Sequence, residues 1–319
     1  RMMGLRADMT PQVARIDANR MRRDTPTRLC YLGTVLRTRP DGMGGTRSPF
    51  QVGAELYGHA GAASDREILS LLMETFRACG VRDVHLDIGH AGIYREVSAR
   101  AGLDRKQTDA LFDMLQRKAV PEIEQWLAAL RLEPKVHEGL AALAMLNGDR
   151  EALKEARSLL SFVGDNVSLY LDMLESLGEM LGQRYPEVSI NYDLSELRGY
   201  RYETGVVYAA YVPDEGREIA RGGRYDGIGR HFGRARPAVG FSTDLKILQR
   251  LTGKDFSGES ALIWAPENGD AELAETVASL RARGERVIVA LDGQTGPRDL
   301  GCTRRLINQG GQWVVQEIE

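Results

Sequence analysis

The sequence has 319 residues, of which 43% are hydrophobic and 27% charged, and its formal net charge is -3 at neutral pH. This composition predicts a globular chain long enough for two domains, each with its own core. The slightly acidic balance gives no electrostatic case for nucleic-acid binding, and no apolar run approaches the roughly 20 residues of a membrane-spanning helix.

The first 90 residues predict three strands and one helix. Strand-forming residues bounded by turn residues predict strands at residues 29–36, 50–58 and 84–90, with a glycine-rich loop at 39–47. A helix is expected to begin near Ser64. Its apolar positions fall on one face and are Ile68, Leu71, Leu72 and Phe76.

The middle of the chain predicts a helical insertion at residues 93–180. This stretch is rich in Ala, Leu, Glu and Arg, and it is interrupted by Pro121, Pro134 and Gly164. Strands are predicted again at residues 188–193 and 202–212.

The last 60 residues predict a separate small α/β domain. Residues 254–259 contain Gly, Ser and acidic residues and read as a linker, so we expect a first domain at 1–253 and a second at 260–319. In the second domain strands and helices should alternate as β-α-β-α-β. The expected elements are a strand at 261–265, a helix at 270–283, a strand at 286–290, a helix at 299–309 and a strand at 313–316.

Cysteine and histidine spacings indicate no metal site. The chain has three cysteines, Cys30, Cys79 and Cys302, which fit neither a disulfide framework nor a Cys-x-x-Cys site and favour a reducing, cytoplasmic location. Its five histidines lack the spacing of metal ligands. The sequence begins at Arg1 within what reads as an extended segment, so we expect a further N-terminal piece to precede it.

Four motifs follow one another in a specific order. They are Leu5-Arg6-Ala7-Asp8-Met9-Thr10, the stretch from Tyr31 to Gly58, the stretch from Leu197 to Gly205, and Arg221-Gly222-Gly223-Arg224-Tyr225-Asp226-Gly227 with Pro237 to Phe241. Together they resemble the histidyl-tRNA synthetases over most of residues 4–250. This resemblance implies an α+β fold of the class II aminoacyl-tRNA synthetase type, with a mixed, mainly antiparallel sheet, a helical insertion and a C-terminal unit similar to a shortened anticodon-binding domain. The family's motif 1, which builds its dimer interface, would lie before Arg1.

The same resemblance implies a histidine-binding pocket. By the family's motifs its residues are Asp8, Thr10, Arg37, Gln51, Glu55, Arg198, Tyr202 and Tyr225. Carboxylates for an ammonium group and an imidazole N–H, and an arginine for a carboxylate, suit a zwitterionic amino acid and bind it without needing to catalyse. Two positions depart from the family pattern, since Glu203 replaces a tyrosine and Arg201 an aspartate, which places a change at the imidazole end.

Positions that contact ATP in the family have changed. Ile247 stands where the family's arginine grips the γ-phosphate, Lys246 stands at the neighbouring glutamate, and Arg39 replaces the glutamate that reads the adenine. Isoleucine cannot form the forked, charge-assisted hydrogen bonds of a guanidinium. We therefore expect a retained amino-acid pocket and a lost nucleotide site.

With a retained amino-acid pocket and a lost nucleotide site, the chain resembles the ATP phosphoribosyltransferase regulatory subunits, the histidyl-tRNA synthetase paralogues of histidine biosynthesis. That resemblance implies a non-catalytic subunit with no cofactor and with histidine as an allosteric ligand for feedback inhibition. Its partner would be the short-form catalytic subunit, and the chain would self-associate as a dimer within a hetero-oligomer. Two alternatives stay open here: an active histidyl-tRNA synthetase, which would need a substitute for the missing arginine, and a stand-alone amino-acid or tRNA-binding module.

Overall fold

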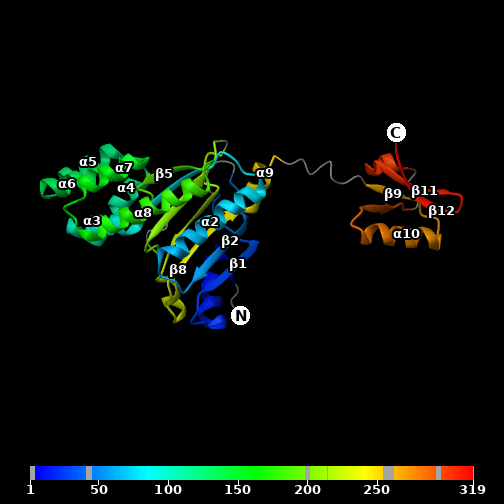
Figure 1. Cartoon of the computed structure of the whole chain (residues 1–319), viewed down its shortest axis with the longest axis horizontal. Helices are drawn as coiled ribbons and strands as arrows, with labels where there is room; N and C mark the ends of the chain where they lie inside the picture. Colours follow the sequence, from blue (N-terminus) through cyan, green and yellow to red (C-terminus); the bar gives the residue numbers. More distant parts are fainter. Residues whose placement is uncertain are drawn as a thin grey trace. The chain divides into compact units, whose positions relative to one another are not determined.

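The computed structural model describes residues 4–40, 45–197, 202–213, 215–253, 262–291 and 296–318. The chain divides into two compact units, residues 1–252 and 253–319. The first is coloured blue to yellow and the second orange to red (Figure 1).

The first unit is built on an eight-stranded sheet with the strand order β1-β2-β8-β7-β6-β3-β5-β4. Within the described chain its one parallel pair is β3 with β5, and the other neighbours run antiparallel. The strands are β1 (Thr27–Thr34), β2 (Phe50–Tyr57), β3 (His85–His90), β4 (Asn147–Gly148), β5 (Ser189–Asp193), β6 (Val206–Tyr211), β7 (Ala220–Arg224) and β8 (Ala238–Asp244). The predicted fold class, a mixed and mainly antiparallel sheet in an α+β chain, is confirmed.

Helix α2 (Ala62–Cys79) covers one face of this sheet (Figure 1). Ile68, Leu72 and Phe76 are buried as predicted, whereas Leu71 is 45% exposed. The prediction was wrong for Leu71 because the buried face of α2 also includes Leu69 and Met73, and at 3.6 residues per turn these two residues shift the centre of that face away from Leu71.

Before β1, the chain forms two short helical elements that the sequence did not predict. Helix α1 (Thr10–Ile16) continues directly into the π-helical turn η1 (Asp17–Met21). Pro11 lies in the first turn of α1, where main-chain N–H groups have no partner within the helix, so the N–H that proline lacks is not needed. These elements place Asp8 and Thr10 at the start of a helix.

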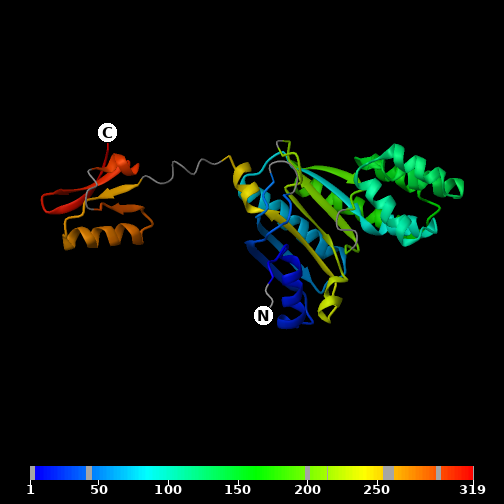
Figure 2. The ribbon, with the colours of Figure 1, turned by 180° about the vertical axis from the view of Figure 1, so that it is seen from behind.

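The predicted helical insertion is present between β3 and β5. Its helices are α3 (Ala91–Arg100), α4 (Arg105–Gln116), α5 (Val120–Ala128), α6 (Pro134–Ala142), α7 (Arg150–Leu159) and α8 (Asp165–Arg184). They gather at the end of the sheet near β5 in both views (Figures 1 and 2). The core residues of the sheet and of these helices form one continuous cluster. The short strand β4 interrupts the helical run and pairs with β5.

Three strands and two helical elements complete the first unit. The predicted strand at 202–212 is shorter than expected, because β6 begins only at Val206. A 3-10 turn, η2 (Ile228–Phe232), joins β7 to β8, and helix α9 (Leu245–Leu251) follows β8 with Asp244 as its N-cap.

The described residues of the second unit form a four-stranded sheet with the order β10-β9-β11-β12 and one α-helix. Its elements are β9 (Ile263–Ala265), α10 (Ala271–Ala282), β10 (Val287–Val289), the 3-10 turn η3 (Pro297–Leu300), β11 (Arg304–Gln309) and β12 (Gln312–Glu317). The central strand β9 pairs in parallel with β10 and β11.

The predicted helix at 299–309 was wrong. Gly301, with φ at 66°, ends the helical turn after η3, and the following residues enter β11. Gly310 and Gly311, with φ at 63° and 94°, form the two-residue turn of a hairpin between β11 and β12. This glycine pair carried the signal that the sequence analysis missed.

No helix in the described part of the chain is long and apolar enough to cross a bilayer. Among the same residues, no group of three or more His, Cys, Asp or Glu side chains could hold a metal ion.

Candidate functional site

Strands β2, β7 and β8 form the floor of two adjoining cavities. The larger, of about 210 Å³, we call the acidic cavity because Asp8, Glu55 and Glu203 line it. The smaller, of about 50 Å³, we call the arginine cavity because Arg37, Arg217 and Arg221 line it. Gln51, Arg221 and Ser242 line both cavities, which therefore adjoin.

Glycine makes room for the acidic cavity's central carboxyl group. Gly240 on β8 lies opposite Glu55 on β2. A Cβ atom at Gly240 would lie 1.5 Å from Oε2 of Glu55, a distance that no side chain could accept. Gly240 is therefore required by the position of the Glu55 side chain.

Glu55 is the central acid of the acidic cavity and is 2% exposed. Its Oε1 accepts a hydrogen bond of 2.9 Å from the hydroxyl of Thr10, and its Oε2 accepts one from the hydroxyl of Tyr225. Burial raises the pKa of Glu55 to about 8, although these donors act in the opposite direction. The carboxyl is thus poised to lose its proton when a cationic group enters the cavity.

Asp8 is held over the sheet by Gln51 of β2. The Gln51 amide donates to Oδ1 of Asp8 at 2.8 Å, and the main-chain N–H of Met9 donates to the Gln51 amide oxygen at 2.9 Å. The main-chain N–H of Thr10 also donates to Oδ1 of Asp8, at 3.2 Å. Thr10 therefore contacts both Asp8 and Glu55, which makes these two acids one connected group.

Six of the eight predicted pocket residues line the acidic cavity. They are Asp8, Thr10, Gln51, Glu55, Tyr202 and Tyr225. Arg37 lines the neighbouring arginine cavity instead, and Arg198 lies outside the described residues. Glu203, which replaces a tyrosine of the third motif, also lines the acidic cavity, and the structure adds one charged residue that the resemblance did not assign, Arg221.

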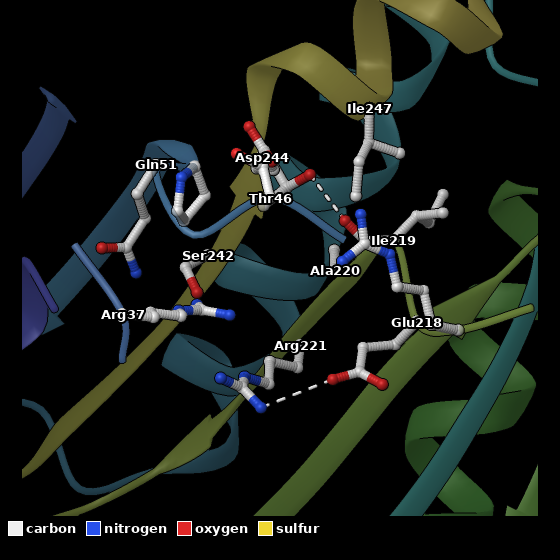
Figure 3. Close-up of a pocket in the computed structure, with 13 residues that line it drawn as sticks. Arg37, Thr46, Gln51, Glu218, Ile219, Ala220, Arg221, Ser242, Asp244 and Ile247 are labelled. Atoms are coloured by element: carbon white, nitrogen blue, oxygen red, sulfur yellow. Dashed lines mark hydrogen bonds and ion pairs between the residues drawn. The ribbon is translucent and has the colours of Figure 1, made fainter. Parts of the chain in front are cut away.

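The arginine cavity has an excess of basic groups, with three arginines against the two acids Glu218 and Asp244 (Figure 3). Arg221 forms an ion pair of 3.4 Å with Glu218. The pKa of Arg37 is lowered, first by burial and then by the positive charge of Arg221. Two guanidinium groups therefore lie close enough to repel one another.

Residues at the changed nucleotide positions do not supply a forked donor to this cavity. Ile247 extends from α9 toward Ile219 in Figure 3 and is 4% exposed within the hydrophobic core. The Lys246 ammonium donates to the main-chain oxygen of Ser48 at 2.8 Å, and Arg39 is exposed. The apolar side chain of Ile247 therefore occupies the position at which the family has its phosphate-binding arginine.

Arg224 of the fourth motif has a structural role. It pairs with Asp65 of α2 at 2.8 Å, and both side chains are buried. It also donates to the hydroxyl of Ser64 at 2.7 Å and to the main-chain oxygen of His59 at 3.1 Å. These contacts join β7 to the first turn of α2, and they leave the adjacent Tyr225 facing Glu55.

Comparisons with known proteins agree with the geometry. Residues 1–248 match the family model described as histidyl-tRNA synthetase, and residues 260–316 match the one described as the ATP phosphoribosyltransferase subunit HisZ C-terminal domain. The chain is 56% identical over 320 residues to the ATP phosphoribosyltransferase regulatory subunit of Thioalkalivibrio sulfidiphilus, covering 100% of this chain and 81% of the relative. It is 50% identical over 318 residues to the protein of the same description from Methylococcus capsulatus, covering 99% and 78%.

A solved structure from Bacillus halodurans, described as an ATP phosphoribosyltransferase regulatory subunit/histidyl-tRNA synthetase, has a similar fold. Its TM-score is 0.80 at 27% sequence identity, and the match covers 93% of this chain and 77% of that one.

Proposed function

The chain belongs to the family of ATP phosphoribosyltransferase regulatory subunits, and we propose that it performs its regulatory role by binding histidine in the acidic cavity. As a member of this family it is a regulatory subunit of an enzyme of histidine biosynthesis. The ligand would be histidine, its site would be the acidic cavity, and its effect on the assembly would be feedback inhibition.

One contrast between the two cavities carries this proposal. The acidic cavity keeps a connected set of amino-acid-binding groups around Asp8 and Glu55, while Ile247 closes the adjoining position with an apolar side chain. A site that binds an amino acid but lacks the arginine that binds a phosphate is suited to sensing the amino acid and not to activating it with ATP. An active synthetase is the less favoured alternative for this reason.

The ligand's groups match the charges of the cavity. Asp8 and Glu55 are suited to the α-ammonium group, and an arginine is suited to the α-carboxylate. Arg221 lines the cavity and is a further candidate for the carboxylate beside the originally expected Arg37 and Arg198. Gln51 orients the ligand through its contact with Asp8.

We also propose the assembly in which this site acts. The catalytic activity would reside in a short-form ATP phosphoribosyltransferase subunit, and this chain would self-associate as a dimer within the hetero-oligomer. We propose domain boundaries at 1–253 and 260–319, the second similar to a shortened anticodon-binding domain. The three cysteines are free thiols, which supports a reducing, cytoplasmic location.

Titration calorimetry with L-histidine tests the site. Glu55→Gln and Arg198→Ala should each weaken binding by roughly 1.5–3 kcal/mol, the contribution of a hydrogen bond to a charged group. Glu67→Gln, on the exposed side of α2, is the control and should leave the affinity unchanged. Unchanged affinity in both site variants would place the histidine site elsewhere.

A further inference from the structure

Two segments far apart in the sequence form a basic surface at one end of the first unit. The dark blue stretch α1–η1 and the yellow turn η2 lie next to each other in both views (Figures 1 and 2). Arg234, which follows η2, donates to the main-chain oxygen of Arg23 at 2.8 Å and pairs with Asp24 at 2.6 Å. We call this surface the arginine patch, and its residues are Arg15, Arg20, Arg22, Arg23, Arg230 and Arg234.

The arginine patch carries much more positive charge than its own acids balance. Residues 15–24 and 228–236 contain seven arginines against two aspartates, a net charge of +5, in a chain whose total is -3. The exposed side chains of the patch that pair with no carboxylate among the described residues are Arg15, Arg20, Arg22, Arg23 and Arg230. Like charges gathered in a small area repel one another, and an anionic surface that binds them relieves this repulsion.

Buried contacts hold the arginine patch in a fixed shape. Arg236 donates to Oδ1 of Asp17 in η1 at 2.8 Å and to the main-chain oxygen of Thr25 at 2.7 Å. Arg236 and Asp17 are 7% and 2% exposed. Arg22 ends η1 with φ at 48°, in the left-handed region that an arginine rarely adopts, so the packing of η1 fixes the direction of the chain there. A surface that is fixed before binding loses less conformational entropy when a partner arrives.

The arginine patch and the acidic cavity lie at opposite ends of one helical stretch. From Thr10 to Met21, α1 continues directly into η1 over a length of roughly 16 Å. At one end Thr10 contacts both Asp8 and Glu55. At the other end the chain enters the arginines of the patch. A partner bound to the patch therefore contacts the same helical stretch that contacts the ligand site.

The chemistry of the patch favours an acidic protein surface as its partner. Guanidinium groups bind carboxylates through forked, charge-assisted hydrogen bonds. Nucleic acid fits less well, because the residues outside the two segments carry a net charge of -8 (-3 minus +5), which would repel phosphates beyond the patch. A twofold dimer centred on the patch would place the arginines of both copies against each other.

We infer that the arginine patch docks an acidic surface of the catalytic subunit. This inference rests on the proposed function and names the surface through which the histidine site reaches its partner. The patch attracts the acidic surface and orients it during encounter, which raises the rate of association. Because the docked partner contacts α1–η1, a ligand that binds beside Thr10 can favour one state of the assembly over another through this stretch.

Charge reversal tests the docking surface. Arg20→Glu, Arg23→Glu and Arg230→Glu are combined in the full-length protein, and its association with a short-form catalytic subunit is followed by surface plasmon resonance at low and high salt. At low salt the association rate should fall by about tenfold or more, and most of its salt dependence should be lost.

The matched control reverses the same number of charges outside the patch. Its substitutions are at the exposed residues Arg82, Arg105 and Arg131. The control should associate at nearly the wild-type rate, since a charge far from the interface is screened by salt. If the reversed protein melts at a lower temperature than the control, Arg20→Gln with Arg23→Gln removes charge without adding acids. This variant should still slow association, by a smaller factor.

The outcomes separate this inference from the proposed function. Calorimetry with histidine on the free protein should give the same affinity for the wild type and the reversed protein. If the wild type binds no histidine but the reversed protein associates slowly, the proposed function is wrong and the docking surface stands. If the wild type binds histidine and the reversed protein associates as fast as the control, the inference alone is wrong. A wild-type protein that does not bind the catalytic subunit contradicts both.

Two other occupants of the patch are tested with the same variants. Binding of a fluorescent tRNA reports a nucleic-acid partner, and sedimentation of the protein alone reports a second copy. We expect the reversed protein to match the control in both measurements. The inference is wrong if the reversal removes tRNA binding or self-association while the catalytic subunit still associates at the control rate.

Discussion

Tyr225 donates its hydroxyl hydrogen to Oε2 of Glu55, and both side chains are almost completely buried. This contact connects the residue after β7 with the middle of β2, on the floor of the acidic cavity. It gives Glu55 a donor but no balancing positive charge, so burial still raises the pKa of Glu55 to about 8.

The raised pKa of Glu55 predicts a loss of stability as the pH rises. Between its ordinary pKa of 4.5 and its folded pKa of about 8, the folded chain binds a proton that the unfolded chain has released. The free energy of unfolding should therefore fall with rising pH, by up to about 1.4 kcal/mol per pH unit from this group. Glu55→Gln should flatten that part of the slope in urea unfolding from pH 5 to pH 8. Parallel curves for wild type and variant would contradict the assignment.

The buried pair of Arg224 and Asp65 should be important for stability. Arg224→Met leaves the Asp65 carboxyl buried without its cation, and the free energy of unfolding should fall by about 3–5 kcal/mol. Arg28→Met is the control, since Arg28 pairs with Glu67 of the same helix at the exposed surface and such pairs contribute little. Denaturant unfolding of the two variants measures both effects, and equal losses would contradict a special role for the buried pair.

Gly240→Ala tests the close approach of β8 to Glu55. The new methyl group would collide with the Glu55 carboxyl, so we expect a loss of about 1–3 kcal/mol of stability and weaker histidine binding. Gly227→Ala is the matched control in the fourth motif, because its Cβ would meet no atom within 4 Å and its φ is -91°. Thermal unfolding and calorimetry check the pair. A Gly240→Ala protein that behaves like the control would show that Glu55 can move freely.

The sequence predicted a helix or strand well where residues next to its ends mark where it begins and stops. β2 was placed within one residue, because its apolar run is bounded by Pro49 and Gly58. A helix was wrongly predicted at residues 299–309 because an apparent helical pattern was given more weight than the turn signal of Gly310-Gly311. The turn is decisive because two glycines with positive φ match a two-residue hairpin.

The site was predictable only at positions that match the family motifs. Glu55 and Gln51 could be carried over residue by residue, and both line the acidic cavity. Arg221 could not, since the motif gives its position no role, and Glu203 could be recognised only as a departure from the tyrosine of the third motif. Their importance depends on burial and on which strands β6 and β7 adjoin, and only the folded chain supplies that information.

The chain should not form histidyl-adenylate. Ile247 is packed in the hydrophobic core and offers no hydrogen bond to a phosphate, so histidine-dependent ATP–pyrophosphate exchange should stay at background. Ile247→Arg should not restore the reaction, because it would bury a guanidinium and destabilise the core. Exchange above background with the wild-type protein would contradict the loss of the nucleotide site.

Regulation of the catalytic subunit by this chain can be measured through the formation of phosphoribosyl-ATP. The purified full-length protein and a short-form catalytic subunit are mixed, and the rate is measured with and without histidine. A ligand bound to this chain can affect a distant active site only by binding one state of the assembly more tightly than another. A coupling of about 1–3 kcal/mol would give roughly 5- to 150-fold inhibition. We predict that the mixture is active, that histidine inhibits it, and that Glu55→Gln reduces the inhibition without abolishing the activity. A catalytic subunit whose rate and histidine sensitivity are the same with and without this protein, and which forms no stable complex with it, would contradict the account.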